Sequence, residues 1–450
     1  MGPIERVVVV GAGIAGLTVA NALAHAGVEC VVVEARQRTG GRLHTIDLEG
    51  SPVDMGGSWI HHPVGNPMRA FARQIGIPCR SGDPLPELAG FDGAEGHRLS
   101  AAEVAANLRI LYETFPEALD RLRIELGPRA SVAEAIEAFV EGADLTAVQA
   151  RQARQGLRAV MEAESADLPE RQSLQWMWNE IEYEGNYFGD LPVGGYRTLV
   201  EAMATGVDVR LGVAVDEVTV STAGVTIRAV DGTTELGSHA VVTVPLGVLK
   251  QDTPRFTPAL PADRVAAIER LGFGYYEKVA LQFDRPFWSD AGFPHAMLFP
   301  HNPAESTVWM IGQDAFDAGP ALVCFVFHSA AHRVLETPPD QAARWVLTML
   351  AEAIGRPCPP PTAVAVTGWA NDPFSRGAYT HIPPGAEPAD VDLLGKPING
   401  RLLFAGEHTQ SARMAYADGA LTSGIREAKR LLHQSTVNLG PIPASTRGDG

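Results

Sequence analysis

The chain has 450 residues, of which 46% are hydrophobic and 20% are charged, so it can bury more than one core and is not an intrinsically disordered protein. Its 53 acidic and 36 basic residues give a formal charge of −17, and no run of Lys or Arg interrupts this balance. The charge argues against binding to nucleic acid and favours a cationic ligand.

A strand–turn–helix–strand unit opens the chain. Residues 6–10 are mostly valine, which is typical of a strand buried on both faces. The loop GAGIAG begins at Gly11, and the Ala- and Leu-rich residues 17–25 predict a helix that ends before Gly27. Residues 30–33 predict a second strand, which Glu34 closes.

The remaining chain predicts a mixture of helices and strands. Helical spacing dominates residues 101–115, 131–141, 145–164, 340–354 and 419–432, and strands are predicted at 208–213, 225–230, 239–244, 278–283, 307–311, 321–327 and 401–405. We expect an α/β fold with a Rossmann-like nucleotide-binding domain built from discontinuous segments. An α+β substrate-binding domain would combine helices with a mixed or antiparallel sheet. The first domain is assigned to 1–80, 206–270 and 393–435, the second to 81–205 and 271–392, and 436–450 to a disordered tail.

The cysteines and the apolar segments set the expected compartment. The four cysteines are widely separated and form no CxxC pair, which argues against a zinc ribbon or a disulfide scaffold: they are Cys30, Cys79, Cys324 and Cys358. The segment MGPIERVVVVGAG lacks the basic region and cleavage site of a signal peptide, and no apolar stretch reaches about 18 residues. We therefore expect a cytoplasmic protein without membrane association.

The glycine-rich loop predicts a dinucleotide site. Gly11 permits the tight turn, Gly13 lets a pyrophosphate approach the backbone, and Gly16 lets the helix pack closely on the strand. The helix N-terminus would then face the phosphate charge. Glu34 would accept hydrogen bonds from ribose hydroxyls and repel a 2′-phosphate, which disfavours NADP. The loop alone leaves NAD and FAD open.

Further motifs favour FAD. Gly40-Gly41-Arg42 suits additional contacts to a pyrophosphate. The segments VVVVGAGIAGLTVANALAHAGVECVVVEARQRTGGR, DMGGSWIHHPVGNP, EKVALQFDRPFW and FAGEHTQSARMAYADGALTSGIREA resemble the flavin-containing amine oxidases, the family of monoamine and polyamine oxidases, and they span almost the whole chain. The resemblance implies an extended FAD held by Gly11, Gly13, Ala15, Gly16, Glu34, Ala35, Arg36, Gly41, Arg42, Gly56, Gly57, Ser58, Trp59, Val215, Trp369, Gly406, Glu407, Tyr416 and Ala417.

Two tyrosines match the aromatic cage of the monoamine oxidases. The resemblance makes Tyr379 and Tyr416 two walls before the flavin, whose π faces would hold an amine with its carbon near flavin N5. Polyamine oxidases place their aromatic residue elsewhere, at the position of Leu421. The residues alone leave open that both tyrosines belong to an ordinary core.

The vicinal pair His61 and His62 is not expected to bind a metal, because adjacent side chains rarely chelate one ion and no Asp or Cys companion lies nearby. The segment WIHHPVGNP resembles one in spermine-type oxidases whose His lines the substrate channel. This resemblance implies that His61 contacts substrate, while His62 stands where that family has a Gly.

Charged residues in apolar surroundings are the remaining candidates. Lys278 begins an apolar strand, where burial of a lysine needs a polar partner. The family's matching lysine reaches flavin N5 through a water, which implies a role in flavin chemistry rather than in stability. The alternative is a surface lysine paired with Glu277 or another acid. We favour a solvated acidic face over a site for a second ammonium for five glutamates of the helical region: Glu162, Glu164, Glu180, Glu182 and Glu184.

The resemblance implies oxidation of an amine by hydride transfer from its α-carbon to flavin N5. An imine and then an aldehyde or ketone would result, with O2 reduced to H2O2. The candidate catalytic residues are Lys278, Tyr379 and Tyr416, and the candidate substrate residues are His61, Tyr379 and Tyr416. FAD is expected to bind non-covalently, because Ala378 replaces the flavin-linking Cys of monoamine oxidases. The expected partners are the amine and O2, without nucleic acid, and a homodimer is the candidate assembly.

Other functions stay open. An L-amino acid oxidase would need a cation to clamp the substrate carboxylate, for which Arg376 is the candidate. An oxidase that tailors a natural-product amine would use the same fold. A non-catalytic relative that binds basic peptides suits the −17 charge, and an NAD-dependent dehydrogenase suits the glycine-rich loop.

Overall fold

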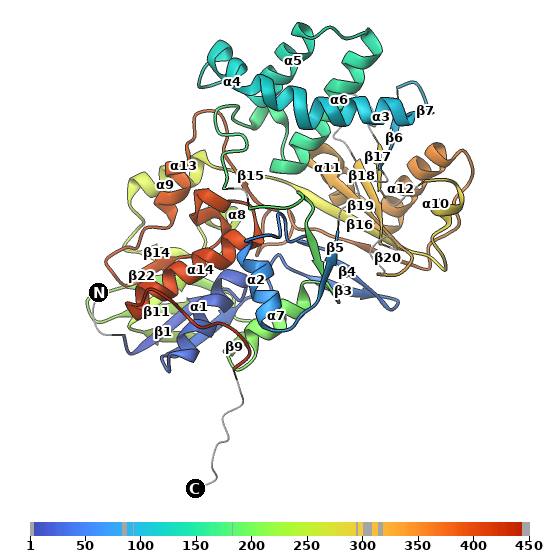
Figure 1. Ribbon diagram of the computed structural model, residues 1–450. Coiled ribbons are helices and arrows are strands. Elements are labelled where there is room, and N and C mark those ends of the chain that lie inside the picture. Colours follow the sequence, from blue (N-terminus) through green and yellow to red (C-terminus); the bar gives the residue numbers. More distant parts are fainter. Residues whose placement is uncertain are drawn as a thin grey trace.

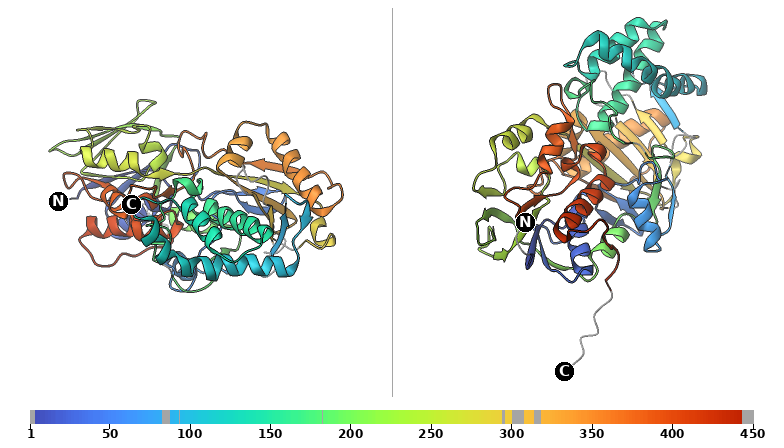
Figure 2. Two further views of the ribbon diagram at one scale, coloured as in Figure 1. Left: turned by 90° about the horizontal axis from the view of Figure 1, so that it is seen from above. Right: turned by 60° about the vertical axis from the view of Figure 1, so that its left-hand side comes forward.

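The structure is a computed structural model that describes residues 4–82, 88–92, 94–181, 183–293, 296–299, 308–313 and 318–442 (Figure 1). Three parts meet around its centre: a parallel sheet with helices, a large and mostly antiparallel sheet, and a layer of helices. This layer lies at the top in Figure 1 and stands away from the parallel sheet in the right-hand view of Figure 2. Over the described ranges, no helix is long and apolar enough to cross a membrane.

Five parallel strands form the first part. Their order is β22 (Leu402–Phe404), β13 (His239–Val242), β1 (Arg6–Val10), β2 (Glu29–Glu34) and β9 (Asp208–Leu211). Successive valines of β1 point to opposite faces, so that Val7 and Val9 pack beneath α1 (Ile14–His25) and Val8 and Val10 pack against a second sheet. This arrangement confirms the expected Rossmann-like unit, in which distant segments of the chain share one sheet.

Both faces of the parallel sheet are covered. The second sheet consists of β12 (Thr234–Gly237), β11 (Val225–Ala229), β10 (Val215–Val220) and β14 (Arg255–Thr257). On the other face α1 contacts α14 (Ala417–Leu432), which in turn contacts α2 (Pro67–Gln74). The helices α1 and α14 approach closely, because a Cβ built on Gly424 would lie 2.6 Å from the Ala15 carbonyl oxygen.

Two segments differ from their sequence assignment. Helix α7 (Arg197–Ala204), which was assigned to the substrate-binding domain, contacts α1 and adds Leu199 and Met203 to its core. Disorder was the wrong expectation for residues 436–442, because Asn21 Nδ2 donates to the Gly440 carbonyl at 2.9 Å and Gly440 N donates back at 3.0 Å. On the tail, these contacts are made by the backbone of Gly440, so the side-chain composition of the tail did not reveal them. Residues 443–450 lie outside the described ranges.

The large sheet has seven strands, which are antiparallel to their neighbours except where β17 meets β6. Their order is β20 (Ala363–Val366), β16 (Tyr276–Gln282), β19 (Ala321–Phe327), β18 (Val308–Gly312), β17 (Ala296–Phe299), β6 (Leu88–Asp92) and β7 (His97–Arg98). Alternate residues such as Val279 and Cys324 pack against α11 (His328–Leu335) and α12 (Pro339–Ile354) on one face. The opposite face is therefore left for the centre of the molecule.

The helical layer has a core of its own and well-defined helix starts. It contains α3 (Ala101–Arg109), the π-helix η2 (Ile110–Thr114), α4 (Phe115–Leu126), α5 (Val132–Gly142) and α6 (Ala147–Ser165). Ser100, Ser131 and Thr146 each begin a helix with a capping box, which satisfies backbone N–H groups at the helix start. The single helix expected over residues 101–115 is instead interrupted by η2.

Short elements connect these parts. They are β3 (Thr45–Leu48), β4 (Ser51–Asp54), β5 (Cys79–Ser81), η3 (Pro169–Arg171), β8 (Asp190–Pro192), α8 (Leu246–Leu249), α9 (Ala262–Arg270), β15 (Gly272–Phe273), α10 (Phe287–Asp290), β21 (Thr380–His381), α13 (Pro388–Leu394), η5 (Glu407–Thr409) and η6 (Ser411–Arg413). The pairs β3–β4, β5–β8 and β15–β21 are antiparallel. They carry the chain repeatedly from the parallel sheet to the large sheet, so both sheets contribute to the central space.

Candidate active site

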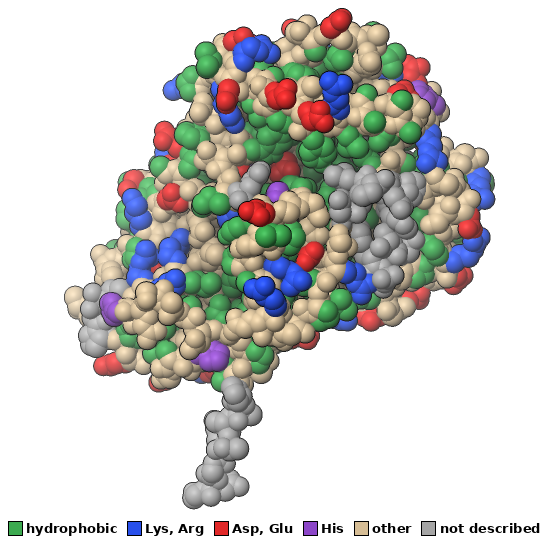
Figure 3. All heavy atoms as spheres, in the orientation of Figure 1, with side chains coloured by type: hydrophobic (Ala, Val, Ile, Leu, Met, Phe, Trp, Pro, Cys, Tyr) green, Lys and Arg blue, Asp and Glu red, His purple; other side chains and the backbone are tan. Residues whose placement is uncertain are grey.

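One cavity of about 990 Å³ lies where the three parts of the molecule meet. Figure 3 shows a hollow beneath the helical layer in which hydrophobic and acidic side chains gather. Every cofactor, substrate and catalytic residue predicted from the sequence lines this cavity, except Gly16. A space of this size is at the upper end of the range for small-molecule sites.

The glycine-rich loop forms one end of the cavity. A Cβ on Gly16 would lie 2.0 Å from the Gly11 carbonyl oxygen, so Gly16 serves the packing of α1 on β1. A Cβ on Gly13, in contrast, would meet no atom within 4 Å, because this position opens toward the cavity at the start of α1. The open backbone at a helix N-terminus suits an anionic group such as a pyrophosphate.

Glu34 lies beside this loop and is only 4% exposed. Its carboxylate accepts hydrogen bonds from Ala12 N at 2.7 Å and Arg36 N at 2.9 Å. Because each carboxylate oxygen can accept more than one hydrogen bond, the group can also receive the hydroxyls of a ribose. Val215, on β10, lines the same end of the cavity.

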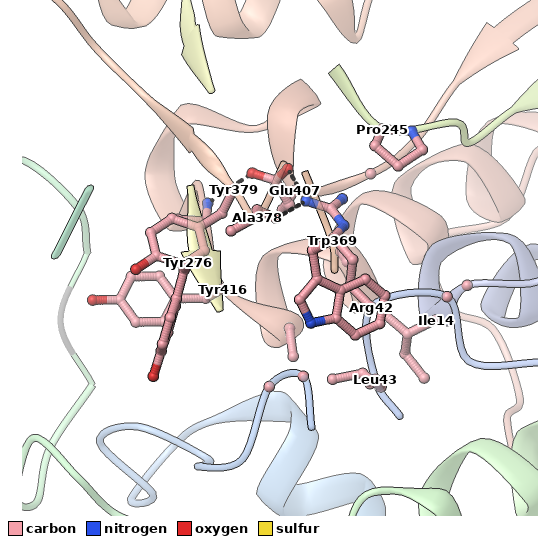
Figure 4. Close-up of a pocket in the computed structure, with 18 of the residues that line it drawn as sticks. Ile14, Arg42, Leu43, Pro245, Tyr276, Trp369, Ala378, Tyr379, Glu407 and Tyr416 are labelled. Atoms are coloured by element: carbon pink, nitrogen blue, oxygen red, sulfur yellow. Dashed lines mark hydrogen bonds and ion pairs between the residues drawn. The ribbon is translucent and has the colours of Figure 1, made fainter. Parts of the chain in front are cut away.

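Arg42 and Glu407 form the middle of the cavity (Figure 4). Arg42 Nη1 donates to Glu407 Oε1 at 2.9 Å and to the Ala378 carbonyl at 2.6 Å. Burial alone would raise the pKa of Glu407, but Arg42 and the Ala415 N–H outweigh burial and lower it. Among the described residues no acceptor contacts Nε or Nη2 of Arg42, so these donors can meet an anionic ligand.

One face of the large sheet forms the floor of the cavity. Tyr276 and Lys278 are two residues apart on β16 and therefore point to the same side. Across the antiparallel pair they stand opposite Phe327 and Phe325 of β19. All four side chains line the cavity, together with Trp309 of β18. The resulting floor is aromatic, with one basic group in its centre.

Lys278 is almost fully buried, and all three of its ammonium donors are used. Nζ donates to the carbonyl oxygens of Asp54 at 2.8 Å and Gly56 at 2.7 Å and to Ser58 Oγ at 2.7 Å. Burial lowers the pKa of Lys278 to about 7, although the charge of Asp54 opposes this shift. Burial likewise raises the pKa of Asp54 to about 6. The contacts give Lys278 a structural role that the sequence-based expectation left out.

The alternative of a surface lysine paired with Glu277 does not hold. Lys278 is 3% exposed and Glu277 is fully buried on the opposite face of β16. The Glu277 carboxylate instead accepts hydrogen bonds from Trp369 N and Ala370 N, both at 2.9 Å. Glu277 therefore positions the loop that brings Trp369 into the cavity, where the indole Nε1 donates to the Met55 carbonyl at 3.0 Å.

Tyrosines form the other end of the cavity, and Figure 4 shows three of them, Tyr276, Tyr379 and Tyr416. The Tyr379 hydroxyl donates to the Ala163 carbonyl, and its ring lies 6.0 Å from that of Tyr276 at an interplanar angle of 88°. The ring of Tyr416 lies 5.3 Å from His61. Burial raises the pKa of both Tyr379 and Tyr416, so their hydroxyls stay neutral.

Arg413 covers one face of Tyr416. Its guanidinium carbon lies 3.9 Å from the ring centroid, and Nε and Nη2 donate to Asp418 at 2.7 and 3.0 Å. The side chains of Arg413 and Asp418 are 2% and 4% exposed. Burial alone would lower the pKa of Arg413, but the hydrogen bond to Asp418 raises it.

The acidic residues of the helical region differ in their exposure to solvent and in whether they line the cavity. Glu164 and Glu180 line the cavity, and Glu162 is 3% exposed, so a solvated acidic face is the wrong expectation for these three. They lie at the end of α6 and in the chain that follows it, where the helical layer meets the sheets. Glu184 is exposed as expected, and Glu182 lies outside the described residues.

His61, the candidate substrate contact, and Arg376, the candidate clamp for a substrate carboxylate, both line the cavity but at different places. Imidazole Nδ1 of His61 contacts the Tyr187 carbonyl at 2.7 Å, and burial lowers the pKa of His61 to about 4. Arg376 also lines the cavity. In the sequence it lies between Phe374 and Ala378. Phe374 packs against Arg36, and the Ala378 carbonyl accepts from Arg42, so this segment lies along the nucleotide half of the cavity.

Neither a metal site nor an aromatic residue at position 421 belongs to the cavity among the described residues. Across the ranges given above, no group of three His, Cys, Asp or Glu side chains is arranged for a metal ion. Leu421 is 1% exposed and packs in the core between α1 and α14, whereas its neighbour Ala420 lines the cavity. The aromatic position of polyamine oxidases is thus part of a helix interface in this chain.

Sequence reasoning missed three residues of the tyrosine end. Tyr276 had a readable signal, because it is two residues before Lys278 on a predicted strand and must share its face. Tyr187 and Arg413 had none, since Tyr187 lies in an irregular segment and Arg413 ends the three-residue η6, where no periodicity can be read. A long-range contact such as that between Arg413 and Ile181 cannot be read from spacing.

Similar sequences and structures are found among flavin-containing amine oxidoreductases and related proteins. Residues 14–432 match the family described as flavin containing amine oxidoreductase. Among curated proteins, Lysine-specific histone demethylase 1 homolog 2 from Oryza sativa subsp. japonica is 33% identical over 443 residues, which cover 96% of this chain and 58% of that protein. Polyamine oxidase 4 from the same organism is 32% identical over 452 residues, which cover 96% of this chain and 90% of that protein.

The chain thus spans little more than half the length of the demethylase relatives that it matches, but most of the length of the polyamine oxidase. A solved structure of a putrescine oxidase double mutant, made in a redesign of cofactor binding, superposes with a TM-score of 0.76. That match covers 96% of this chain and all of the other at 21% identity, so it shows a shared fold.

Proposed function

The chain belongs to the family of flavin-containing amine oxidoreductases, and from this premise we propose that it oxidises an amine that carries a second positive charge. The observation that supports this proposal is the single cavity, which joins a dinucleotide cradle at Gly13 and Glu34 to a cluster of tyrosines around Tyr416. A cofactor and a substrate can therefore meet in one enclosed space without any rearrangement of the domains.

The cofactor is FAD, in accordance with the family. Gly13, Glu34 and Arg42 would hold its nucleotide and phosphate groups, because they offer the open backbone, the acceptor and the free cationic donors described above. When bound, FAD supplies an acceptor that takes a hydride from the carbon next to the amine nitrogen and is reoxidised by O2, which becomes H2O2. With water, the oxidised amine gives an aldehyde or ketone and ammonia or a smaller amine.

The tyrosine end would bind and orient the amine. Neutral tyrosine rings attract a cation or the partial positive charge of an amine N–H through their π faces. Holding the amine in one orientation lowers the entropy cost of reaching the transition state. His61 is uncharged at neutral pH, because its pKa is about 4, and so does not repel a cationic substrate.

Glu164 and Glu180 supply the reason for a second charge on the substrate. Both line the cavity close enough to the tyrosines that their charges help to raise the pKa of Tyr416, after burial. A diamine or polyamine would place its distal ammonium against these carboxylates, whereas a simple monoamine has no second charge to place there. The −17 charge of the chain adds a long-range attraction for such substrates.

The test is H2O2 release from matched pairs of amines, each pair consisting of a diamine and the monoamine of equal chain length. We expect the diamine to have the higher kcat/KM, and the purified protein to be yellow. Equal rates for both members of each pair would contradict the role of the two glutamates. Absence of oxidation across the whole panel would contradict the proposed function itself.

A second candidate substrate is the methylated lysine side chain of a basic peptide. The relatives named as lysine-specific histone demethylases favour it. A dimethyl-lysine peptide incubated with the holoprotein would release formaldehyde if this candidate is correct. Formaldehyde release faster than diamine oxidation would make the peptide the preferred substrate, and its absence would remove it.

We also propose that FAD is bound without a covalent link. Ala378 lines the cavity where the resemblance places a flavin-linking Cys, and none of the four cysteines lines the cavity. Acid precipitation should leave a colourless pellet and free FAD in the supernatant. A yellow pellet after thorough washing would overturn this point.

A further inference from the structure

The buried pair of Arg413 and Asp418 has no part in the function proposed so far, although it lies directly against the tyrosine end. Three groups hold the Arg413 guanidinium: Asp418 accepts from Nε and Nη2, the Ile181 carbonyl accepts from Nη1 at 3.1 Å, and the Tyr416 ring lies 3.9 Å from Cζ. The ring of Tyr183 lies 5.1 Å from the same carbon. A guanidinium with this many partners is fixed in place.

The position of Arg413 leaves Tyr416 with one open face. An aromatic ring has two π faces, and the guanidinium lies over one of them at 3.9 Å from the ring centroid. A substrate amine can therefore approach only the opposite face. The ring itself cannot turn without losing the contact, so its plane is set by Arg413.

The same contact changes what the open face attracts. The π face of a free tyrosine is negative and favours a cation. A permanent positive charge behind the ring opposes this attraction, because the two charges would face each other across a dry ring. Asp418 reduces the effect but does not cancel it, since its carboxylate meets the Nε–Nη2 edge of the guanidinium while Cζ lies over the ring.

Arg413 also connects Tyr416 to the glutamates. Ile181 N donates to the Ala412 carbonyl at 2.8 Å, and the Ile181 carbonyl accepts from Arg413, so the backbone next to Glu180 is fixed to η6. The backbone that carries Glu180 is thereby held next to Arg413. A substrate with two nitrogens would meet two different environments, one at Glu180 and one at Tyr416.

We propose that Arg413 is a positioning residue that fixes Tyr416 and makes its open face select the uncharged form of the reacting amine. This inference rests on the proposed function, because an amine must lose its proton before its α-carbon can give up a hydride. The distal ammonium is taken by the glutamates, and the nitrogen at Tyr416 binds as the free base.

The test compares two probes of equal shape on the purified holoprotein: choline, and its neutral isostere in which a tert-butyl group replaces trimethylammonium. Binding of each is followed by the change that it causes in the flavin absorbance spectrum. Arg413→Met should shift the preference toward choline by about tenfold relative to wild type. Asp418→Asn leaves Arg413 without its counter-charge and should shift the preference the opposite way. Arg413→Lys keeps the charge and should stay closest to wild type.

The control is Arg270→Met. Arg270 makes a similar contact with Asp390, through Nε at 3.3 Å and Nη2 at 2.5 Å, but neither residue lines the cavity. Its preference between the two probes should equal that of wild type. If Arg413→Met fails to fold, Asp418→Asn decides alone, and an unchanged or reversed shift in that variant overturns the inference.

The same preparations are assayed for H2O2 release from a diamine, which separates two kinds of failure. Oxidation with no change in probe preference overturns the role of Arg413 and leaves the proposed function intact. Opposite shifts in the two variants without any oxidation support the charge selection at Tyr416 but contradict the proposed reaction.

Discussion

The two ends of the cavity are built in different ways. At the nucleotide end, backbone meets backbone: a Cβ would lie 2.0 Å from a carbonyl oxygen at Gly16 and 1.8 Å from one at Gly56. At the tyrosine end, side chains meet side chains across ring separations of 5 to 6 Å, as between His61 and Tyr416 at 5.3 Å and between Tyr276 and Tyr379 at 6.0 Å. At these two glycines there is no room for a side chain, whereas the tyrosine end consists of side chains.

This difference separates two kinds of sensitivity. Contacts of the backbone with itself cannot adapt, so a substitution at a glycine that makes such a contact acts first on folding. Side chains at the tyrosine end can be exchanged for others of similar volume while the fold is kept, so substitutions there act first on the substrate. The predictions below test this division, beginning with the largest expected effect.

The strongest test lies within the glycine-rich loop itself. Gly16→Ala forces a Cβ against the Gly11 carbonyl and should lower the free energy of unfolding by about 3 kcal/mol, measured by urea denaturation of the apoprotein. Gly13→Ala meets no protein atom and should leave apoprotein stability unchanged while weakening FAD binding at least about tenfold. Equal stability loss in both variants would show that Gly13 is not open, and unchanged FAD binding in Gly13→Ala would show that the cofactor does not bind against it.

Lys278 lies between the two ends and should combine both kinds of effect. Its pKa falls from 10.5 to about 7 on folding, so between these values the unfolded chain binds more protons than the folded one. Stability of the wild type should therefore rise with pH across this window, with a slope of at most about 1.4 kcal/mol per pH unit. Lys278→Met should lack this component of the slope, measured by denaturation at a series of pH values.

Asp54 has the opposite pH dependence. Its pKa rises from 3.8 to about 6 on folding, so its own contribution to stability falls as the pH rises between these values, and the slope due to Lys278 is best measured in the upper part of its window. We also expect Lys278→Met to slow flavin reduction or reoxidation about tenfold in stopped-flow experiments, because it removes a cation next to Ser58 in the cavity. Identical slopes and identical half-reactions in the variant and the wild type would leave Lys278 without either role.

At the tyrosine end, loss of a ring should affect catalysis and spare the cofactor. Tyr416→Leu and Tyr379→Leu should each lower kcat/KM for an amine by about two- to thirtyfold, with the FAD content unchanged. Tyr379→Phe keeps the ring and loses the hydrogen bond to the Ala163 carbonyl, so it should remain near wild type. A larger loss in the Phe variant than in the Leu variant would assign the effect to the hydroxyl.

The smallest expected effect concerns the glutamates of the cavity. Glu164→Gln and Glu180→Gln should each reduce the preference for a diamine over the matched monoamine by about two- to fivefold, because each removes one attraction for the distal ammonium. Glu184→Gln is the control, since Glu184 is exposed and does not line the cavity. A response of all three variants by the same factor would indicate only a general effect of charge.

The nucleotide end of the cavity could be predicted from the sequence to a greater extent than the tyrosine end. The loop at Gly11–Gly16 and the acid at Glu34 are close in sequence and in space, so their spacing carries their arrangement. Tyr276 was within reach through its two-residue separation from Lys278. The contact of Arg413 with Tyr416 and Ile181 joins irregular segments and depends on how three layers close, which no local pattern records. The tail at Gly440 and helix α7 were missed for the same reason.

The order of strands in the parallel sheet has a consequence for the synthesis of the chain. The glycine-rich loop emerges first, but β22 and α14, which lie between Leu402 and Leu432, complete the sheet and bring Glu407 and Tyr416 to the cavity. A nascent chain that ends before β22 holds the nucleotide motif without the wall that faces it. We therefore expect stable insertion of the cofactor only after translation has passed α14, and until then the unfinished parallel sheet keeps an unpaired edge at β13.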